Sequence, residues 1–239
     1  MRICVLSDVH SNLPALEAIL AAMAPYDALW HLGDIVGYGP QPNEVVARLA
    51  AEGALGVRGN HDAAAIGQLP TDAFNDEARA AVEWTADQLS DISRAWLTDL
   101  PERREIADFT LVHGSPRDPT WEYVFTGRTA RGSMAQVTST HCLVGHTHVP
   151  MAYLIEDSTV EAHSPDGAAL ELAARRALLN PGSVGQPRDG DKRASGMVID
   201  TDNHTVEWRR AEYDIGNVQE LMREAGLPRR LVQRLELGL

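Results

Sequence analysis

The sequence predicts an α/β fold in which two β-sheets of mixed strands pack against each other and helices flank them. In residues 1–60, short apolar runs alternate with helical patterns, which is typical of domains with a mainly parallel sheet. Beyond Pro150, short strand-like runs separated by turn residues favour antiparallel hairpins. No linker, internal repeat or low-complexity tract separates the two halves, so we expect one domain over residues 1–239 with a shared core.

The first elements repeat a strand–loop–helix order. Residues 2–8 form a short apolar run that ends in polar residues, which favours a buried strand. Ser11 or Asn12 can cap the helix that should follow it. The same order recurs in a strand at 28–34, a capped helix at 43–52 and a third strand at 54–58.

A helical segment separates these elements from the later strands. Residues 71–108 carry ten acidic side chains against four arginines on a helical pattern. Its apolar positions are Val82, Leu89, Trp96, Leu97 and Leu100. We therefore expect a helical insertion at about 63–108. Its acidity has two interpretations, a solvated helical face or an acidic lid that selects substrates.

Beyond residue 108 the sequence pattern predicts mostly short strands. They are expected at 109–113, 141–145, 151–155, 159–162, 168–173, 197–200 and 206–210. Residues 164–167 and 202–203 are typical of the turns between them. Two helices, at 215–225 and 228–235, should follow.

Composition limits the classes of function. With 44% hydrophobic and 23% charged residues the chain resembles ordinary globular domains, and it has no apolar run long enough to span a membrane. The formal net charge of −13 argues against strong binding to nucleic acid or to an anionic membrane. Asp8 follows the first apolar run too closely for a signal peptide, so we expect a cytoplasmic protein. Cys4 and Cys142 lie in strand-like runs, which indicates buried free thiols.

Five short polar clusters directly follow predicted strands. They are Asp8-Val9-His10, Gly33-Asp34, Gly59-Asn60-His61-Asp62, His113-Gly114 and Gly145-His146-Thr147-His148. Because loops at the carboxyl ends of parallel strands gather at one edge of a sheet, we expect the clusters to converge. A lone histidine after an apolar run is commonly structural, but that interpretation does not explain five clusters.

The side chains in these clusters have the chemistry of metal ligands. The candidates are Asp8, His10, Asp34, Asn60, His113, His146 and His148. Carboxylate, amide oxygen and imidazole together suit divalent Mn, Fe, Zn, Co or Ni. Seven ligands exceed the needs of one tetrahedral ion and fit two ions that share a carboxylate, an arrangement used for in-line phosphoryl displacement. We therefore expect a hydroxide that bridges two ions to attack phosphorus.

The ordered set D-x-H, G-D, G-N-H-D, H-G and G-H-T-H resembles the calcineurin-like metallophosphoesterase superfamily over about residues 1–200. The segments GDIVGYGP at 33–40 and NPGSVG at 180–185 are similar to its small bacterial and archaeal phosphodiesterase branch, near the diadenosine tetraphosphatase-like proteins. The resemblance implies the α/β/β/α metallophosphoesterase fold. It also implies two divalent metal ions, with Mn favoured, at one edge of the sandwich.

The resemblance assigns roles to individual residues. It places Asp8, His10, Asp34 and His148 on a first ion, and the bridging Asp34 with Asn60, His113 and His146 on a second. His61 corresponds to the catalytic histidine of the superfamily, which donates a proton to the leaving oxygen or stabilises charge on the phosphate. No phosphoenzyme intermediate is expected.

The leading hypothesis is a di-metal phosphoesterase that cleaves phosphodiester or nucleotide pyrophosphate bonds in a small phosphoester substrate. One alternative is a phosphomonoesterase or phosphoprotein phosphatase. In phosphoprotein phosphatases an aspartate after the G-D element pairs with the catalytic histidine, whereas residues 35–37 here are Ile, Val and Gly. The other alternative is a non-catalytic scaffold of the same fold, like the retromer subunit, which the complete ligand set disfavours. The sequence leaves the oligomeric state open.

Other residues are weaker candidates for substrate contact. Asn12 could bind phosphate at the N-terminus of the first helix or only cap that helix. Arg188 could reach a phosphate or make a surface ion pair. Arg58 ends a strand, where a structural contact is the more ordinary role. Trp121 and Tyr123 could stack on a nucleobase or pack in the core.

Overall fold

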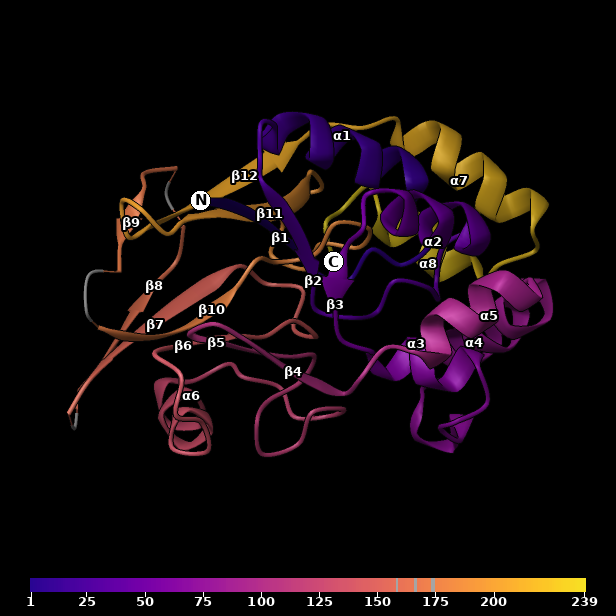
Figure 1. Ribbon diagram of the computed structural model, residues 1–239. Coiled ribbons are helices and arrows are strands. Elements are labelled where there is room, and N and C mark those ends of the chain that lie inside the picture. Colours follow the sequence, from indigo (N-terminus) through magenta and orange to yellow (C-terminus); the bar gives the residue numbers. More distant parts are fainter. Residues whose placement is uncertain (158, 166, 173–174) are drawn as a thin grey trace.

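Two six-stranded sheets stack face to face in the computed structural model of the chain (Figure 1), which describes residues 1–157, 159–165, 167–172 and 175–239. The strand order is β3-β2-β1-β11-β12-β9 in the first sheet and β4-β5-β6-β10-β7-β8 in the second. Helix α1 packs on β11 and β12 of the first sheet, and α2, α7 and α8 extend the same apolar core. Helix α6 packs on the second sheet, while α3, α4 and α5 lie at one end (Figure 1). The predicted α/β fold of two mixed sheets with flanking helices is confirmed.

The elements have the following bounds. The first sheet contains β1 (Arg2–Leu6), β2 (Ala28–His31), β3 (Leu55–Gly56), β9 (Leu170–Glu171), β11 (Ala194–Asp200) and β12 (Thr205–Ala211). The second contains β4 (Arg103–Ile106), β5 (Phe109–Val112), β6 (His141–Leu143), β7 (Met151–Glu156), β8 (Thr159–His163) and β10 (Arg176–Asn180). The helices are α1 (Leu13–Met23), α2 (Pro42–Ala51), α3 (Asn60–Ala65), α4 (Asp76–Gln88), α5 (Asp91–Thr98), α6 (Gly127–Met134), α7 (Ile215–Glu224) and α8 (Arg229–Arg234), with a 3-10 turn at Thr71–Ala73.

Each sheet combines parallel and antiparallel pairs. In the first sheet β1 runs parallel to β2 and antiparallel to β11, so that Ile3 lies opposite both Ala28 and Ile199. In the second sheet β6 runs parallel to both β5 and β10. The strands that precede the five polar clusters are therefore parallel to one another within each sheet, and their carboxyl ends lie at one edge.

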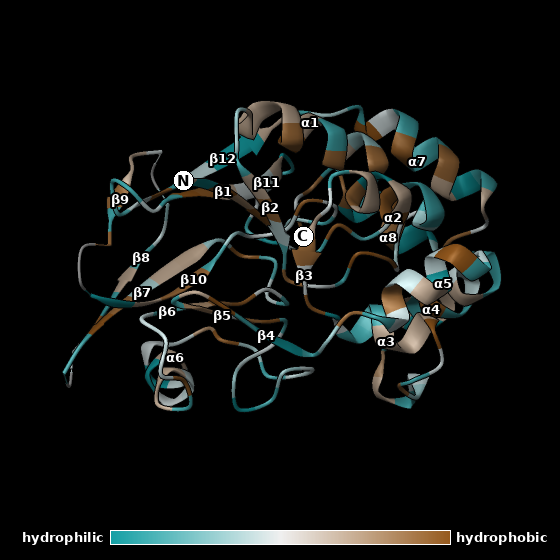
Figure 2. Ribbon diagram, in the orientation of Figure 1, coloured by the Kyte–Doolittle hydropathy of each residue, from teal (hydrophilic) through white to brown (hydrophobic). Residues whose placement is uncertain are grey.

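The apolar core has three layers, and alternation along β1 divides side chains between two of them. Ile3 and Val5 face the second sheet, whereas Cys4 and Leu6 face the helices over the first sheet. All four side chains are fully buried. A third layer packs α6 against the outer face of the second sheet. Figure 2 shows brown and teal residues alternating on the outer helices, as expected for helices with one buried side.

Local sequence patterns do not predict strand β10 of the second sheet or helix α6, which packs on that sheet. β10 is buried along almost its whole length on both faces, so it shows no alternation of apolar and polar residues. Helix α6 contains two glycines among its eight residues, a poor helical composition. It is stabilised by the Thr126 side chain, which accepts a hydrogen bond from the Thr129 N–H, and by burial of Ala130 and Met134.

Two boundary predictions are wrong. The helical prediction extends through residues 103–106, but these residues form β4, which pairs antiparallel with β5 at the edge of the second sheet. Helix α2 begins at Pro42, and the Asn43 side chain does not cap it but bonds instead to the Gln88 carbonyl and the Ser90 N–H. The predicted turn 164–167 and strand 168–173 lie partly outside the described residues, which include β9.

Cys4 and Cys142 are buried free thiols, as the sequence predicts. Within the described ranges, none of the helices combines the length and the apolar character needed to cross a lipid bilayer.

His31, at the end of β2, makes the stability of the fold sensitive to acid. Its ring is fully buried and packs on Trp96, with ring centres 5.5 Å apart. Burial lowers the pKa of His31 to about 3. Because the same group has a pKa of about 6.5 in an unfolded chain, protons bind preferentially to the unfolded state between these values. The contribution of neutral His31 is fully present above pH ~6.5 and decreases as the pH falls toward 3.

Substitution His31→Leu should remove this pH-dependent component. Between pH 8 and pH 5 the unmodified chain should lose about 2 kcal/mol more unfolding free energy than the variant, measured by urea titration at both values. The variant His204→Asn, at an exposed turn, should retain the pH dependence of the unmodified chain. An equal loss in the unmodified chain and in His31→Leu would contradict the assignment.

Candidate metal centre

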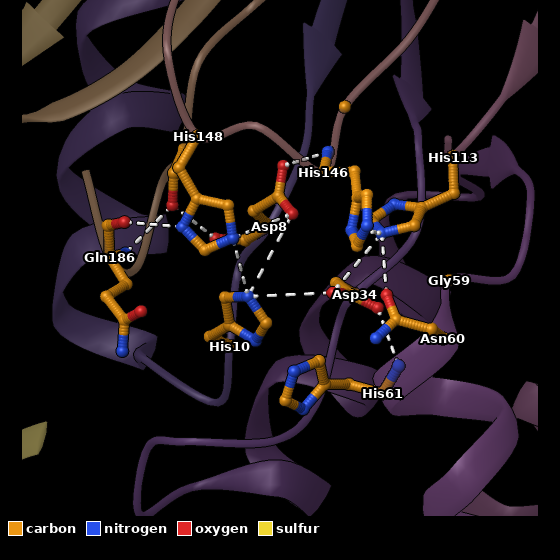
Figure 3. A network of polar contacts seen from close by, with 12 residues as sticks. Asp8, His10, Asp34, Gly59, Asn60, His61, His113, His146, His148 and Gln186 are labelled. Atoms are coloured by element: carbon orange, nitrogen blue, oxygen red, sulfur yellow. Dashed lines mark hydrogen bonds and ion pairs between the residues drawn. The ribbon is translucent and has the colours of Figure 1, made fainter. Parts of the chain in front are cut away.

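The five polar clusters meet at the carboxyl edge of the sandwich (Figure 3). They follow β1, β2, β3, β5 and β6, and the cluster after β3 forms the first turn of α3. The predicted ligands Asp8, His10, Asp34, Asn60, His113, His146 and His148, and also His61, are at most 4% exposed. The fold therefore brings side chains from five separate loops into one buried group.

Five of these residues have a left-handed backbone conformation. Asp8, His10, Asp34, His146 and His148 have φ angles between 47° and 65°. Non-glycine residues occupy this region rarely, at a cost of ~1–3 kcal/mol each. Hydrogen bonds between loops hold the strained backbone, since Asp8 N donates to the Gly33 carbonyl (3.1 Å) and His10 N to the Asp34 carbonyl (3.0 Å). Strain concentrated in this way is typical of a functional site.

Asp8, His10 and His148 form a first group of potential ligand atoms. His148 Nε2 lies 3.2 Å from Asp8 Oδ1 and 3.2 Å from His10 Nε2, and the three ligand atoms all lie within 4.8 Å of one another. His10 Nδ1 donates to the Val36 carbonyl (3.1 Å) and His148 Nδ1 to the Gln186 carbonyl (2.6 Å). Because Nδ1 carries the hydrogen in both rings, the Nε2 lone pairs face the group.

Asp34, His113 and His146 form a second group. His113 Nε2 lies 3.3 Å from Asp34 Oδ2, 3.0 Å from His146 Nδ1 and 3.1 Å from Asn60 Oδ1. His113 Nδ1 is directed at the Leu32 carbonyl at 2.8 Å. Asp34 Oδ2 also lies 3.7 Å from His10 Nε2 in the first group. One carboxylate therefore lies between the two groups, where a bridging ligand is expected.

The donor set fits two divalent cations. Ligand atoms ~2.1 Å from one ion and at right angles to each other are about 3 Å apart, and the neighbouring imidazole nitrogens here are separated by 3.2 Å in the first group and 3.0 Å in the second. Asp8 Oδ1 is buried and has no hydrogen-bond donor among the described residues. An unpaired buried carboxylate oxygen is costly, and a cation shared with His10 and His148 would satisfy it.

The charge states of most of these groups suit metal binding. Burial alone would raise the pKa of Asp8 and Asp34, but the neighbouring imidazoles hold both pKa values below the usual range. Burial lowers the pKa of His10, His148 and His146, to about 3 for His146.

His113 differs from the other ligand histidines. Burial lowers its pKa, but the charges of Asp34 and Asp8 and the hydrogen bonds to Asp34 and the Leu32 carbonyl together raise the pKa of His113 to about 9. A proton and a cation compete for the same lone pair, so metal binding at His113 would release a proton.

His61 lies beside the two groups and belongs to neither (Figure 3). Its ring packs against the rings of Tyr38, His10 and Phe74, with centres 4.3, 4.9 and 4.9 Å apart. Gly37 makes this position possible, because it has a φ of +90° and a Cβ there would lie 2.5 Å from His61 Nδ1. That Nδ1 atom has no hydrogen-bond partner among the described residues. The ring is thus held in place by packing.

Asp62, next to His61, has a structural role. Its carboxylate accepts hydrogen bonds from the Val36 and Gly59 N–H groups, both at 3.0 Å, and so joins the loops after β2 and β3. Ile35 and Val36, which follow Asp34, are fully buried apolar side chains. Neither segment supplies the carboxylate that pairs with the catalytic histidine in phosphoprotein phosphatases.

Asn12 and Arg58 both make structural contacts, and a substrate contact by Asn12 stays a prediction. Asn12 is 1% exposed; its Oδ1 accepts from Ala15 N (3.2 Å) and its Nδ2 donates to the Gly185 carbonyl (3.1 Å). Both ends of the amide are therefore used, and Asn12 caps α1. Arg58 contacts Glu102 at 3.7 Å and the Thr98 carbonyl at 3.4 Å, which are structural contacts.

Arg188, Trp121 and Tyr123 line a cavity of about 90 Å³ beside the metal-binding groups, called here the inner cavity. Tyr123 stacks on His146 with ring centres 4.0 Å apart, and Trp121 packs on Phe74 at 5.2 Å. Tyr38 and Phe74 also line this cavity, and the sequence analysis missed both. The sequence feature that could have indicated Tyr38 as a site residue is its position between two glycines in the segment after Asp34.

The acidic segment 71–108 flanks the site with uncharged residues. Ala73, Phe74, Asn75 and Ala78 line the inner cavity. Glu77 lines a second, larger cavity next to it, where it pairs with Arg230. This placement favours the solvated-face interpretation over an acidic lid.

Substitution Asp34→Asn should remove both metal ions, whereas Asp8→Asn should weaken only the group that contains Asp8. The reason is that a neutral amide is a poorer ligand than a carboxylate, and Asp34 lies between both groups. Elemental analysis of protein purified without added metal should find about two ions per chain in the unmodified protein, fewer in Asp8→Asn and fewest in Asp34→Asn. The exposed variant Asp72→Asn serves as the control. Unchanged metal content in Asp34→Asn would rule out the shared-carboxylate arrangement.

Comparison with known sequences identifies relatives along the whole chain. Residues 1–204 match the calcineurin-like phosphoesterase superfamily domain. The chain is 36% identical over 245 residues to the uncharacterized protein MJ0912 of Methanocaldococcus jannaschii, covering 99% of this chain and 98% of that protein. It is 26% identical over 214 residues to the phosphodiesterase YfcE of Escherichia coli strain K12, covering 83% of this chain and 87% of that protein.

A solved structure supports the same relationship. The crystal structure of a metallophosphoesterase from Sphaerobacter thermophilus is 46% identical to this chain, with a TM-score of 0.91 and coverage of 100% of this chain and 99% of that one. Together with the match over residues 1–204 and the two buried Asp/His groups, this shows that the chain belongs to the calcineurin-like phosphoesterase superfamily.

Proposed function

We propose that this chain is a di-metal phosphoesterase that hydrolyses phosphodiester or nucleotide pyrophosphate bonds by in-line attack on phosphorus. The observation that supports it most directly is the pair of buried Asp/His groups joined by Asp34, next to a cavity that His61 and Arg188 also line. When bound, two divalent ions, with Mn favoured, would lower the pKa of water and neutralise phosphate oxygens.

His61 and Arg188 are the groups of this chain that would act on the substrate phosphate. His61 is buried at the inner cavity, and an imidazole there can donate an N–H to a phosphoryl or leaving-group oxygen. Arg188 lines the same cavity, and its guanidinium can hold phosphate oxygens through two parallel hydrogen bonds. Both groups are positioned without help from substrate, which reduces the ordering cost of binding.

Diester or anhydride cleavage is favoured over the alternatives by two observations. The chain shares 26% identity with a protein named as a phosphodiesterase. The carboxylate next to the histidine of phosphoprotein phosphatases has no counterpart at Ile35, Val36 or Asp62. A scaffold role is disfavoured because the predicted ligands and His61 lie together in the site. We further propose a cytoplasmic location and a small phosphoester as the substrate.

Activity should appear with added Mn on at least one of bis-(p-nitrophenyl) phosphate, p-nitrophenyl phosphate and diadenosine tetraphosphate. A higher rate on the diester or the dinucleotide than on the monoester is expected, and the opposite order would favour the phosphomonoesterase alternative. Absence of hydrolysis of all three under every divalent metal tested would falsify the proposed function.

The variant His61→Asn should lower kcat on the order of 100- to 10,000-fold, because a positioned proton or hydrogen-bond donor contributes that much to catalysis. Its metal content should stay at the value of the unmodified chain, since His61 lies outside both ligand groups. The exposed His204→Asn substitution provides the matched control. Full activity in His61→Asn would show that another group acts on the substrate.

A further inference from the structure

A second cavity of about 510 Å³ adjoins the inner cavity and is called here the outer cavity. The two cavities share four lining residues, Tyr38, Asn75, Tyr123 and Arg188. Helix α8 contributes much of the remaining wall, including Arg234. A volume of this size is within the range of small-molecule sites. Part of a substrate whose scissile phosphate lies at the metal centre can therefore extend toward α8.

Two arginines at this cavity have no Asp or Glu partner among the described residues. Arg188 donates to the Gln186 side-chain oxygen at 2.8 Å, and the adjacent Asp189 is already paired with Arg210. Arg234 Nε donates to the main-chain oxygen of Leu239, the last residue of the sequence. Neither guanidinium takes part in an ion pair with an Asp or Glu within the described ranges.

Arg230 provides a contrast on the same helix. It also lines the outer cavity, but its charge is paired with Glu77 at 3.5 Å and its side chain is 81% exposed. Glu77, the acidic side chain in the wall of this cavity, is thus paired with Arg230. Arg188 and Arg234 are the arginines in the wall that have no Asp or Glu partner within the described ranges.

Arg188 and Arg234 line the same cavity, and their like charges repel each other. Burial lowers the pKa of Arg234 to about 10, and the charge of Arg188 is the next cause. Like charges held together in a partly buried wall are unfavourable until an anion lies between them. Guanidinium groups are well matched to phosphate, because their planar N–H donors pair with its oxygens.

Backbone and side-chain contacts fix Arg188 and α8 relative to the metal centre. Arg188 N donates to the carbonyl of the predicted ligand His148 at 3.3 Å. Farther along the same loop, Gly190 N donates to the Gly238 carbonyl at 3.0 Å, and Lys192 pairs with Glu236 at 3.1 Å. The loop therefore connects the metal centre to the segment that follows α8.

We propose that Arg188 and Arg234 form a second anion subsite, which binds a phosphate adjacent to the scissile one. This inference rests on the proposed function and narrows its substrate class to phosphoanhydrides such as nucleoside polyphosphates. Hydrolysis adds water across the bridge: the water oxygen bonds to the scissile phosphorus, the bond from that phosphorus to the bridging oxygen breaks, and the bridging oxygen leaves with the neighbouring phosphate. The subsite holds that leaving phosphate. Arg234 lies beyond residues 1–204, the region that the superfamily match covers.

The test compares Arg234→Gln with Arg230→Gln in the full chain with its metal. In Arg234→Gln, the ratio of kcat/KM on diadenosine tetraphosphate to kcat/KM on bis-(p-nitrophenyl) phosphate should fall on the order of 10- to 100-fold, because one charge-assisted contact is lost. Arg230→Gln should keep this ratio within about twofold, since Glu77 already pairs with Arg230. Arg234→Lys should restore part of the ratio.

Calorimetric binding gives a readout independent of turnover. The affinity for methylenediphosphonate, which resists hydrolysis, should fall in Arg234→Gln, while the affinity for inorganic phosphate stays the same. If no substrate is cleaved but diphosphonate binding still depends on Arg234, the proposed function fails and the subsite stands. If hydrolysis occurs and Arg234→Gln changes neither the ratio nor the diphosphonate affinity, the subsite is wrong and the proposed function stands.

Discussion

The carboxylate of Asp34 is the group on which the rest of the site depends. Its Oδ2 lies 3.3 Å from His113 Nε2 and 3.7 Å from His10 Nε2, and its Oδ1 accepts a hydrogen bond from His61 N at 2.9 Å. One buried side chain thus connects loops that follow β1, β2, β3 and β5. A buried charge without partners is strongly unfavourable, and imidazoles and a backbone N–H group surround this carboxylate.

Both sheets are needed to place those partners. Asp8 and Asp34 follow strands of the first sheet, whereas His113 and His146 follow strands of the second. The two edges are joined directly, since His146 N donates to Asp8 Oδ2 at 3.1 Å. The apolar layer between the sheets fixes their separation and offsets the strain of the five left-handed residues in the site, because every buried Å² of apolar surface contributes about 25 cal/mol.

The distribution of charge explains how a chain with a formal net charge of −13 can suit an anionic substrate. Around the metal-binding groups, the side of the acidic segment that faces the site is uncharged. At the outer cavity, Arg188 and Arg234 have no Asp or Glu partner within the described ranges. The nearby acidic residues Asp189 and Glu77 are paired with Arg210 and Arg230. The electrostatic potential at the site depends on which nearby charged side chains are paired, and not on the net charge of the whole chain.

Much of the site could be predicted from the sequence because its signals are local. Each ligand cluster follows directly after an apolar run. The run predicts a strand, and the residues next to it are the candidate ligands, so one short segment indicates both. His61 was assigned only through the resemblance of Asn60-His61-Asp62 to the superfamily motif. Periodicity indicated the helices α1 and α2, because their apolar positions repeat along a short segment.

Tertiary structure alone decided the features that depend on contacts between distant segments. β10 shows no alternation because both of its faces are buried by other elements, and α6 forms on a glycine-containing segment that packs on the second sheet. The Asn12 side chain donates a hydrogen bond to the Gly185 carbonyl, far along the chain, a contact that no local pattern indicates. The outer cavity exists because α8 packs beside the loop of Arg188. A local sequence pattern indicates the secondary structure of its own segment. The residues that neutralise or pack against its side chains lie elsewhere in the chain, so only the tertiary structure identifies them.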